Sequence, residues 1–451
     1  MTQPRAVAFL PVITKARELE ARVLLAAYLL KAGYTVVLGR AGEVNHAALN
    51  SRNGLYFSPL LVRAAAPRLA ALKARGHIII GWDEEGLVYP DPDWYFSNRV
   101  SSEAVKHIDA LIAWGPVPAR DLAATLPPSS GPILPFGNAR IDLLREPYSK
   151  IYEPAAMRLR ERFGRYILVN TNFDLVNHIE GPDGLVRRMR ASGRIAGEAD
   201  EQKFAQWGRF RQRMFDSFME GLPVLHDALP ELTFVLRPHP SENLAPWHAL
   251  AARFPRIVIE PPRNPVYSWI MGAQAVLHNS CTTAVEAFMF GVPVIAYCPP
   301  AEDGAMDSPL PNQLSRVAHS WQEIVESLDQ LGESGRRSWF TNEQKELADS
   351  FIGGRSGAYS SERLVELAKS LGGDALSTHI SPQGRTYRAV RTIIRNLLGP
   401  IHHKNDNYNR FKSLVIGELS ELFEMHQDLI EKDYSISTLA RDIFLIETKH
   451  E

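Results

Sequence analysis

The sequence predicts an α/β protein made of two similar domains in tandem, with a cleft between them. The chain has 451 residues, which suits two domains of about 200 residues each with a remainder. Short β-rich runs alternate with helical patterns, as is typical of parallel α/β layers. The alternation starts again near residue 166, so we expect domains at residues 1–150 and 151–372 and a helical extension at residues 373–451.

The first domain begins with a clear strand–helix–strand unit. Residues 6–10 form an apolar run typical of a buried strand, and residues 16–31 have apolar positions at helical spacing. Gly33 ends this helix, and the next strand is expected at residues 34–38. Shorter apolar runs predict further strands at residues 77–81, 110–114 and 133–135.

The second domain carries polar residues at the ends of its predicted strands. Its first strand is expected at residues 166–170, within YILVNTNF, and a long polar helix at about residues 200–227 follows. Four more apolar runs, LTFVLRPHP, RIVIEPP, AVLHNS and VPVIAY, each end in polar or turn residues. Because parallel sheets bind ligands at the carboxyl ends of their strands, we expect one common rim with Arg237, His239, Glu260, Asn279 and Ser280.

The extension shows two helical patterns, at residues 385–398 and 409–430, after a turn-rich linker. The first pattern places four arginines at spacings of three to four residues beside an apolar face. Such a helix suits peripheral contact with an anionic membrane surface. It also suits a helix that packs onto the two domains with its arginines in solvent.

Composition and charge are those of an ordinary globular protein. There are 50 basic and 51 acidic residues, and 45% of the residues are hydrophobic, so we expect no whole-chain attraction to nucleic acid. The N-terminus lacks the uncharged core of a signal peptide, and no apolar run approaches the length of a spanning helix. The only two cysteines, Cys281 and Cys298, are expected to be free thiols in a cytoplasmic protein.

Three consecutive acids, Asp83, Glu84 and Glu85, follow the predicted strand at residues 77–81. A run of acids is often only a solvated loop. Neighbouring acids at a cleft would instead raise one another's pKa and keep a proton acceptor available, while Gly86 would let backbone approach a substrate. If the strand continues, Glu84 faces away from the other two acids, and a turn at this point would remove that alternation.

The most specific stretch is LHNSCTTAVEAFMFGVPVIAY, residues 277–297. A strand ends at His278, and a small polar cluster that contains Ser280 and Thr282 opens a helix. The free N–H groups and the positive dipole end of such a helix, together with the hydroxyls, can hold a phosphate. The alternative is that Ser280 and Thr282 only cap the helix.

The segment FVLRPHPSEN presents a histidine between two prolines. Pro238 and Pro240 restrict the backbone on both sides of His239, so its side chain is held with little freedom. A lone histidine is often structural, but one beside a phosphate can neutralise the charge of a leaving group or donate a proton to it. Because we expect His239 to lie near the hydroxyl-rich turn, we interpret it as a functional residue.

These motifs together carry a family resemblance. EEG at residues 84–86, HP at residues 239–240 and the NSCTT turn resemble the motifs of GT-B glycosyltransferases that use CMP-activated acidic sugars, namely bacterial sialyltransferases and Kdo transferases of capsule and lipopolysaccharide. FGNARIDLL, residues 136–144, is similar to a segment of the surface carbohydrate biosynthesis group. The resemblance covers about residues 5–370 and implies two facing Rossmann-like domains, of which the second holds most of the nucleotide.

The resemblance also implies the catalytic roles. An acid of the EEG motif would be the general base on the acceptor hydroxyl, or the nucleophile in retaining relatives. Glu84 is the choice by alignment with the motif, with Asp83 and Glu85 beside it. His239 would meet the phosphate of CMP and assist its departure.

The binding roles follow from the same resemblance. Ser280, Thr282 and Thr283 would hold the phosphate, and Glu286 or Glu260 would accept hydrogen bonds from the ribose. Further contacts to phosphate or to the sugar carboxylate are expected from Asn170, Asn172, Arg237, Asn138 and Arg140, although Arg140 also suits an ordinary interdomain salt bridge. The departing group is a monophosphate and no DxD-like acid pair adjoins the turn, so we expect metal-independent transfer with no cofactor besides the CMP-sugar donor.

Other functions remain open on the sequence alone. A CDP-glycerol-type phosphotransferase of the teichoic-acid polymerase kind also has an RPHP-like segment and a serine-containing turn, but its acceptor attacks phosphorus. A UDP-sugar 2-epimerase has a similar two-domain fold, although this chain lacks the acid-rich nucleotide turn expected there. A non-catalytic nucleotide-sugar-binding scaffold is a further alternative, against which the intact acids, histidine and hydroxyls argue. For a transferase, we expect a glycan or lipid-linked glycan acceptor at the cytoplasmic face.

Overall fold

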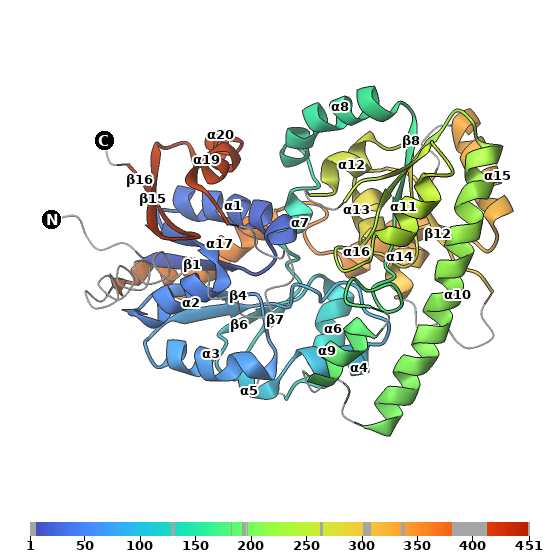
Figure 1. The fold of residues 1–451 in the computed structure, drawn as a ribbon. Coiled ribbons are helices and arrows are strands. Elements are labelled where there is room, and N and C mark those ends of the chain that lie inside the picture. Colours follow the sequence, from blue (N-terminus) through green and yellow to red (C-terminus); the bar gives the residue numbers. More distant parts are fainter. Residues whose placement is uncertain are drawn as a thin grey trace, which may run out of the picture. The chain divides into compact units, whose positions relative to one another are not determined.

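The computed structural model describes residues 6–127, 131–181, 183–191, 195, 197–261, 265–300, 308–334, 339–380 and 413–449. The chain forms two compact units (Figure 1). The first unit consists of Met1–Leu87, Asp91–Tyr148 and Asp349–Glu451, and the second unit of Val88–Pro90 and Ser149–Ala348. Each unit contains its own sheet, so the predicted α/β class with two domains is confirmed.

The first unit is built on an eight-stranded sheet in the order β15-β16-β2-β1-β4-β5-β6-β7. Six of these strands are parallel. Their order across the sheet is β2-β1-β4-β5-β6-β7, so only the first two strands of the chain are exchanged relative to the sequence. Their bounds are β1 (Val7–Val12), β2 (Thr35–Arg40), β4 (Leu55–Ser58), β5 (Ile78–Gly81), β6 (Ala110–Ile112) and β7 (Ile133–Leu134). The described helices of this unit include α1 (Lys15–Lys31), α2 (Ala41–Leu49), α3 (Ala66–Lys73), α4 (Pro92–Arg99), α5 (Ser102–Val105), α6 (Pro116–Thr125), α7 (Ala139–Asp142) and α17 (Ser360–Ser370).

The second unit has a six-stranded parallel sheet in the order β10-β9-β8-β11-β12-β13. In chain order this is third, second, first, fourth, fifth, sixth, which is the order of the Rossmann fold. The strands are β8 (Tyr166–Asn170), β9 (Thr233–Arg237), β10 (Ile257–Ile259), β11 (Ala275–His278), β12 (Val294–Tyr297) and β13 (Arg316–Ala318). The helices include α8 (Glu153–Phe163), α9 (Gly184–Ala191), α10 (Glu198–Ala228), α11 (Ala245–Ala251), α12 (Tyr267–Gly272), α13 (Thr283–Met289), α14 (Pro309–Gln313), α15 (Trp321–Ser334) and α16 (Asn342–Phe351).

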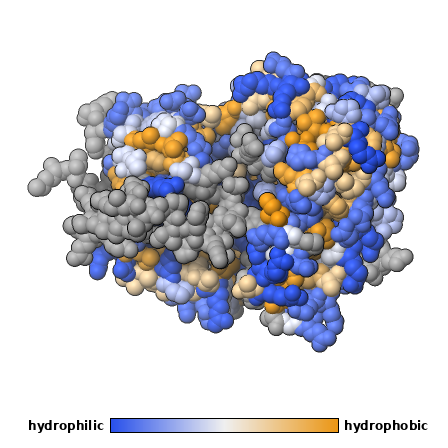
Figure 2. All heavy atoms as spheres, viewed as in Figure 1, coloured by the Kyte–Doolittle hydropathy of each residue, from blue (hydrophilic) through white to orange (hydrophobic). Residues whose placement is uncertain are grey.

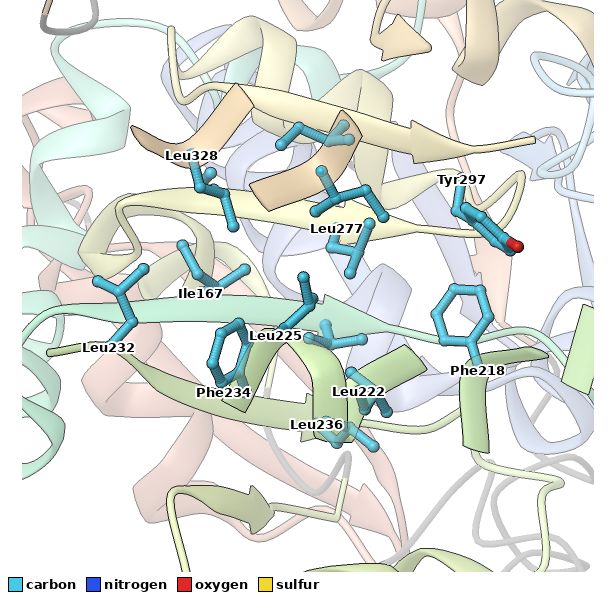
Figure 3. Close-up of a cluster of buried hydrophobic side chains, with 14 of the residues drawn as sticks. Ile167, Phe218, Leu222, Leu225, Leu232, Phe234, Leu236, Leu277, Tyr297 and Leu328 are labelled. Atoms are coloured by element: carbon cyan, nitrogen blue, oxygen red, sulfur yellow. The ribbon is translucent and has the colours of Figure 1, made fainter. Parts of the chain in front are cut away.

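One face of the second sheet is covered by α10, the longest described helix of the unit. Its apolar side chains Phe218, Leu222 and Leu225 recur at intervals of three and four residues, so they form one buried stripe. This stripe packs on alternate side chains of the strands, such as Ile167 and Leu277 (Figure 3). The residues between them along each strand face the layer of α12 and α13. The sheet is therefore held rigidly, and its strand ends are fixed in place.

The C-terminal part of the chain differs from the predicted helical extension. Two short helices, α19 (Ile416–Glu424) and α20 (Gln427–Ile430), are followed by an antiparallel hairpin of β15 (Tyr434–Ala440) and β16 (Ile443–Thr448), drawn in red in Figure 1. β16 pairs antiparallel with β2, so this segment extends the first sheet. The predicted helix at residues 385–398, with its membrane-contact hypothesis, lies outside the described residues.

The predicted domain boundary at residue 372 also needs correction, because the described residues from Asp349 onward belong to the first unit. The N–H of Gly353 donates to the carbonyl of Trp114 at 2.5 Å. The buried carboxylate of Asp142 accepts the N–H groups of Ser360 and Ser361, both at 2.8 Å, and so caps α17 from within the first unit. A short pair of β14 (His379–Ile380) and β3 (Ser51–Arg52) adds a further link.

Candidate active site

The three acids of the first unit lie in a turn directly after β5. The strand ends at Gly81, and the N–H of Gly86 donates to the carbonyl of Asp83 at 3.1 Å. A Cβ at position 86 would lie 3.2 Å from that carbonyl oxygen, which is a tight contact. Strand alternation therefore does not decide which way the acids point, and each one is described by its own contacts.

Asp83 is buried and bound on both carboxylate oxygens. Arg99 of α4 donates to it from Nε at 2.7 Å and from Nη2 at 2.5 Å, and the Tyr95 hydroxyl donates at 3.0 Å. The indole N–H of Trp114 donates to the Asp83 carbonyl at 2.8 Å. A two-pronged arginine pair of this kind fixes a carboxylate firmly, so Asp83 organises the turn.

Glu84 is buried with an arginine of α1. Arg22 Nη2 donates to Glu84 Oε1, which also accepts the indole N–H of Trp82 at 2.5 Å. Only 1% of the Arg22 side chain and 3% of the Glu84 side chain are exposed, and the guanidinium lies 4.6 Å from the centre of the Trp82 ring. Burial opposes ionisation of Glu84, but the charges of Arg22 and Arg140 prevail and hold its pKa below the ordinary value. Glu84 is therefore an ionised, enclosed carboxylate.

Glu85 is the most exposed of the three acids, with 37% of its side chain accessible. It forms an ion pair with Arg17 Nη1 at 2.7 Å. Burial of the carboxylate is outweighed by Arg17, Arg99 and Arg140, which lower the pKa of Glu85. The expectation that neighbouring acids raise one another's pKa is thus wrong for Glu84 and Glu85, because arginines from other elements supply the nearest opposite charge.

A fourth acid, Glu18, adjoins this cluster and was not predicted. Its two oxygens accept the N–H groups of Ile13 at 2.8 Å and Thr14 at 3.0 Å, directly after β1. Burial and the nearby charge of Glu84 raise the pKa of Glu18. Because β1 and β5 are parallel strands of one sheet, these acids gather at its carboxyl edge.

Asn138 and Arg140 lie in the first unit at the start of α7. The Asn138 side chain accepts the N–H of Arg140 at 3.0 Å and so caps this short helix. The Arg140 guanidinium lies 5.4 Å from the ring centre of Trp114, and its charge lowers the pKa of Glu84 and of Glu85. Arg140 therefore belongs to the same charged cluster as the acids.

In the second unit, the strand order reverses between β8 and β11, and polar residues meet there. Asn170, the last residue of β8, lies beside His278, the last residue of β11. Just beyond the strands, the N–H of Asn172 donates to Asn279 Oδ1 at 2.9 Å. Arg211 of α10 donates to the Asn279 carbonyl at 3.2 Å. The carboxyl ends of strands at such a reversal are where open α/β sheets bind ligands.

The hydroxyl-rich turn after β11 is held from several sides. Ser280 has a left-handed backbone with φ of 59°, and its hydroxyl donates to Asn312 Oδ1 at 3.1 Å. The N–H of Cys281 donates to His278 Nδ1 at 3.2 Å, and His278 Nε2 lies 2.8 Å from Ser315 Oγ. Burial lowers the pKa of His278 to about 3, so its ring is neutral. Thr282 occupies the N-cap of α13 and makes no capping hydrogen bond with its side chain. Neither hydroxyl therefore serves as a helix cap.

His239 lies in the loop after β9, with 41% of its side chain exposed. Its Nδ1 accepts the N–H of Ser241 at 3.3 Å, and Asp174 Oδ2 lies 3.9 Å from the same nitrogen. The loop is anchored by the buried carboxylate of Glu242, which accepts the N–H of His239 at 3.0 Å. Sequence reasoning missed Glu242, although the residue stands within the quoted RPHPSEN segment.

The remaining residues that were predicted to bind the donor differ in burial and in their partners. Arg237 is buried over the ring of Trp269, 4.7 Å from its centre, and burial lowers its pKa to about 10. Glu260 binds Arg162 at 2.6 Å, and Glu286 is buried on α13. Asn170 is 97% buried, and its amide Nδ2 has no hydrogen-bond partner among the described residues. A buried donor without a partner at the point of strand reversal suits a ligand or an ordered water.

Among the described residues, no group of three or more His, Cys, Asp or Glu side chains is arranged to hold a metal ion. Cys281 and Cys298 are free, as predicted. The helices in the described part of the chain include none that is long and apolar enough to cross a membrane. On the face shown in Figure 2, hydrophilic residues surround smaller hydrophobic patches.

Comparison with family models and with curated proteins gave no match. Among solved structures, the wall teichoic acid polymerase TagF is similar with a TM-score of 0.44 and 10% identity, over 70% of this chain and 71% of that chain. UDP-GlcNAc 2-epimerase from Neisseria meningitidis, bound to UDP-GlcNAc, has a TM-score of 0.41 and 17% identity, over 70% and 76%. Anabaena HepE in complex with UDP has a TM-score of 0.43 and 12% identity, over 81% and 100%. At these levels the similarities identify neither the family nor the substrate of this chain.

Proposed function

We propose that the chain is a nucleotide-sugar-dependent glycosyltransferase whose second unit binds the donor phosphate at the reversal of strand order. The observation that carries this proposal is the cluster of Asn170, Asn172, Asn279 and Ser280 at the ends of β8 and β11. This is the position at which doubly wound sheets bind nucleotides. The buried amide of Asn170, which has no partner in the described part of the chain, supplies a donor for such a ligand.

The chemistry of this rim suits an anion. Thr282 is exposed at the first turn of α13, and its side chain is not used as a cap. Ser280 is fixed in a left-handed conformation beside it. His239 is partly exposed on the loop after β9, two strands away from this turn, so an imidazole is available on the same edge of the sheet as the hydroxyls and amides. Glu260, which binds Arg162, and Glu286, which is buried on α13, are the two candidates for the ribose hydroxyls.

The proposed donor is a CMP-activated acidic sugar of the nonulosonic or Kdo type. This choice rests on the resemblance of the EEG, HP and NSCTT motifs. In the transfer, the bond between the anomeric carbon and the phosphate oxygen breaks, and CMP leaves with help from His239. The acceptor oxygen forms the new bond to the anomeric carbon and gives up its proton to an acid of the first unit. Arg140 is a candidate partner for the sugar carboxylate. The proposed acceptor is a glycan or lipid-linked glycan.

Two of the acids compete for the role of general base. The motif favours Glu84, whereas exposure favours Glu85, because Glu84 is enclosed by Arg22 and Trp82. A lowered pKa makes each a weaker base but keeps it ionised at neutral pH. We propose that Glu85 is the member that an acceptor reaches and that Glu84 fixes Arg22 beneath it.

A donor panel tests the proposal. Purified protein is incubated with CMP-Kdo, CMP-sialic acid, CDP-glycerol or UDP-GlcNAc, with and without EDTA, and released nucleotide is measured. The proposal predicts CMP release from one of the CMP-sugars that is insensitive to EDTA. Release of CMP from CDP-glycerol instead would favour the phosphotransferase, and tight binding without turnover would favour a scaffold. EDTA inhibition that magnesium reverses would contradict the metal-independent mechanism.

A further inference from the structure

The loops that follow β8 and β9 are joined around one buried carboxylate. Glu242, 2% exposed, accepts on Oε1 from the Thr171 hydroxyl at 2.8 Å and from the N–H groups of Phe173 and His239, both at 3.0 Å. Its Oε2 accepts the indole N–H of Trp247 at 3.0 Å. Residues on both loops thus converge on a single side chain.

All four donors to Glu242 are uncharged groups. Burial raises the pKa of Glu242, while the hydrogen bonds from Phe173, Thr171 and His239 and the charge of His239 act in the opposite direction. Within the described residues, no lysine or arginine forms an ion pair with this carboxylate. A buried carboxylate that is held by neutral donors alone costs free energy, so packing alone does not explain a glutamate at this position.

Further backbone bonds make the two loops one body. The N–H of Asn243 donates to the Asn177 carbonyl at 2.8 Å, and the Asn177 amide returns a bond to the Asn243 carbonyl at 2.9 Å. The N–H of Ile179 donates to the Ser241 carbonyl at 2.8 Å. The loop that carries His239 is therefore tied to the loop that carries Asn172, which contacts the hydroxyl-rich turn through Asn279.

The orientation of the His239 ring follows from the same network. The N–H of Ser241 donates to Nδ1 at 3.3 Å, so the neutral ring carries its proton on Nε2. The ring remains partly exposed, which leaves Nε2–H available to a ligand. Glu242 fixes the His239 backbone, and the ring is set by the next turn of the same loop.

We propose that Glu242 is a positioning residue for the donor site: it acts through His239, holding the imidazole in register with the residues at the end of β8. This inference rests on the proposed function, in which His239 assists the departing phosphate. Preorganised groups need no rearrangement when charge develops, so loss of the Glu242 contacts reduces turnover more than it reduces donor binding.

A double-mutant cycle tests the coupling. Glu242→Gln keeps the shape of the side chain but replaces one oxygen with an NH₂ group, which faces the Trp247 indole in one orientation and the three donors to Oε1 in the other, so all four donors cannot be satisfied. We expect Glu242→Gln to lower kcat for nucleotide release by about tenfold or more in the parent, with a smaller change in KM. In a His239→Ala background the same substitution should change kcat by less than about twofold. An equal loss in both backgrounds would overturn the inference.

A matched control separates positioning from general destabilisation. Tyr166 lies at the opposite end of β8, where its hydroxyl donates to the Trp269 carbonyl at 2.7 Å. Tyr166→Phe removes one buried hydrogen bond from the same unit without touching the loops. We expect its kcat to equal that of the parent at a temperature at which both are fully folded. A loss like that of Glu242→Gln would attribute the effect to destabilisation and contradict positioning.

Hydrogen exchange gives a readout that needs no donor. Mass spectrometry of peptides that cover residues 171–181 and 238–243 reports on the amides bound to Glu242 and between the loops. We expect exchange in both peptides to be about tenfold faster in Glu242→Gln and unchanged in Tyr166→Phe. Unchanged exchange in Glu242→Gln would overturn the inference. If no donor of the panel is turned over, the proposed function fails, and exchange still decides whether Glu242 holds the loops.

Discussion

The two strand-end clusters are built from opposite kinds of contact. In the first unit, Asp83, Glu84 and Glu85 are each bound by an arginine, namely Arg99, Arg22 and Arg17. In the second unit, the polar groups meet mostly amides and hydroxyls, as between Asn172 and Asn279 or between Ser280 and Asn312. The first cluster is already compensated in charge, whereas the second has neutral donors and the unpartnered buried amide of Asn170 within the described chain.

This difference separates two uses of polar residues at a sheet edge. A buried ion pair leaves an uncompensated charge when one partner is removed, so the enclosed pair of Glu84 and Arg22 should affect stability strongly. At the second edge, the neutral groups bind one another or water. A ligand can replace these hydrogen bonds at a small cost in free energy. We therefore expect substitution of the enclosed Glu84 to act mainly on folding, and substitutions of Glu85 and of the second cluster to act mainly on donor binding and turnover.

The largest expected effect is on the stability of the Glu84 pair. Glu84→Gln removes the carboxylate charge from Arg22, which is 1% exposed, and should lower the free energy of unfolding by about 3 kcal/mol. Glu85→Gln, at an exposed pair that solvent screens, should cost at most about 1 kcal/mol. Urea denaturation of both variants measures the difference. Equal losses in the free energy of unfolding would contradict the distinction between an enclosed Glu84 and an exposed Glu85.

Turnover of the same two variants assigns the general base. Measured per folded molecule, Glu85→Gln should lose about two orders of magnitude in kcat, the usual scale for a missing base. If Glu84→Gln shows that loss and Glu85→Gln does not, the base is the residue that the motif selects.

Elements with strong local patterns could be predicted from the sequence, and those defined by distant partners could not. The strand at residues 166–170 matches β8, and the helix at residues 16–31 differs from α1 by one residue. β4 was missed at a short apolar run that directly follows Gly54. The hairpin of β15 and β16 was missed because its stabilising partner, β2, lies about 400 residues earlier in the chain.

The candidate site was predictable to a similar extent. The rim with His239, Asn279 and Ser280 followed from strand ends, because alternating α/β topology puts these ends at one edge. The arginines that bind the acids could not be found, since Arg22 lies on α1 and Arg99 on α4, and spacing along the chain does not reveal such pairs. Glu242 was overlooked because a single acidic residue in a predicted loop is usually exposed to solvent.

His239 provides the next test, in the second cluster. His239→Ala should lower kcat for nucleotide release by about a hundredfold and leave the free energy of unfolding nearly unchanged, because the side chain is 41% exposed. His248, an exposed histidine on α11 of the same unit, supplies the matched control, and His248→Ala should retain parental turnover. Full activity of His239→Ala would remove the histidine from the reaction.

The pH dependence of stability probes the turn of the second unit. Burial lowers the pKa of His278 to about 3 in the folded protein, against an ordinary 6.5, so the unfolded chain binds more protons between these values. The stabilisation is complete above about pH 6.5 and decreases as pH falls toward about 3. Urea unfolding between about pH 7.5 and about pH 4.5 should therefore depend less on pH in His278→Gln than in the parent. An unchanged slope in His278→Gln would contradict the neutral, buried histidine.

The central claim is that the turn after β11 binds the donor phosphate, and calorimetric titration with CMP tests it most directly. The parent should bind CMP, and the double variant Ser280→Ala/Thr282→Val should bind it about tenfold more weakly, which corresponds to about 1.4 kcal/mol. Thr341, whose hydroxyl accepts the N–H of Gln344 at the start of α16, is the control, and Thr341→Val should bind CMP as the parent does. Absence of CMP binding by the parent, or equal affinity of the double variant and the parent, would contradict the account.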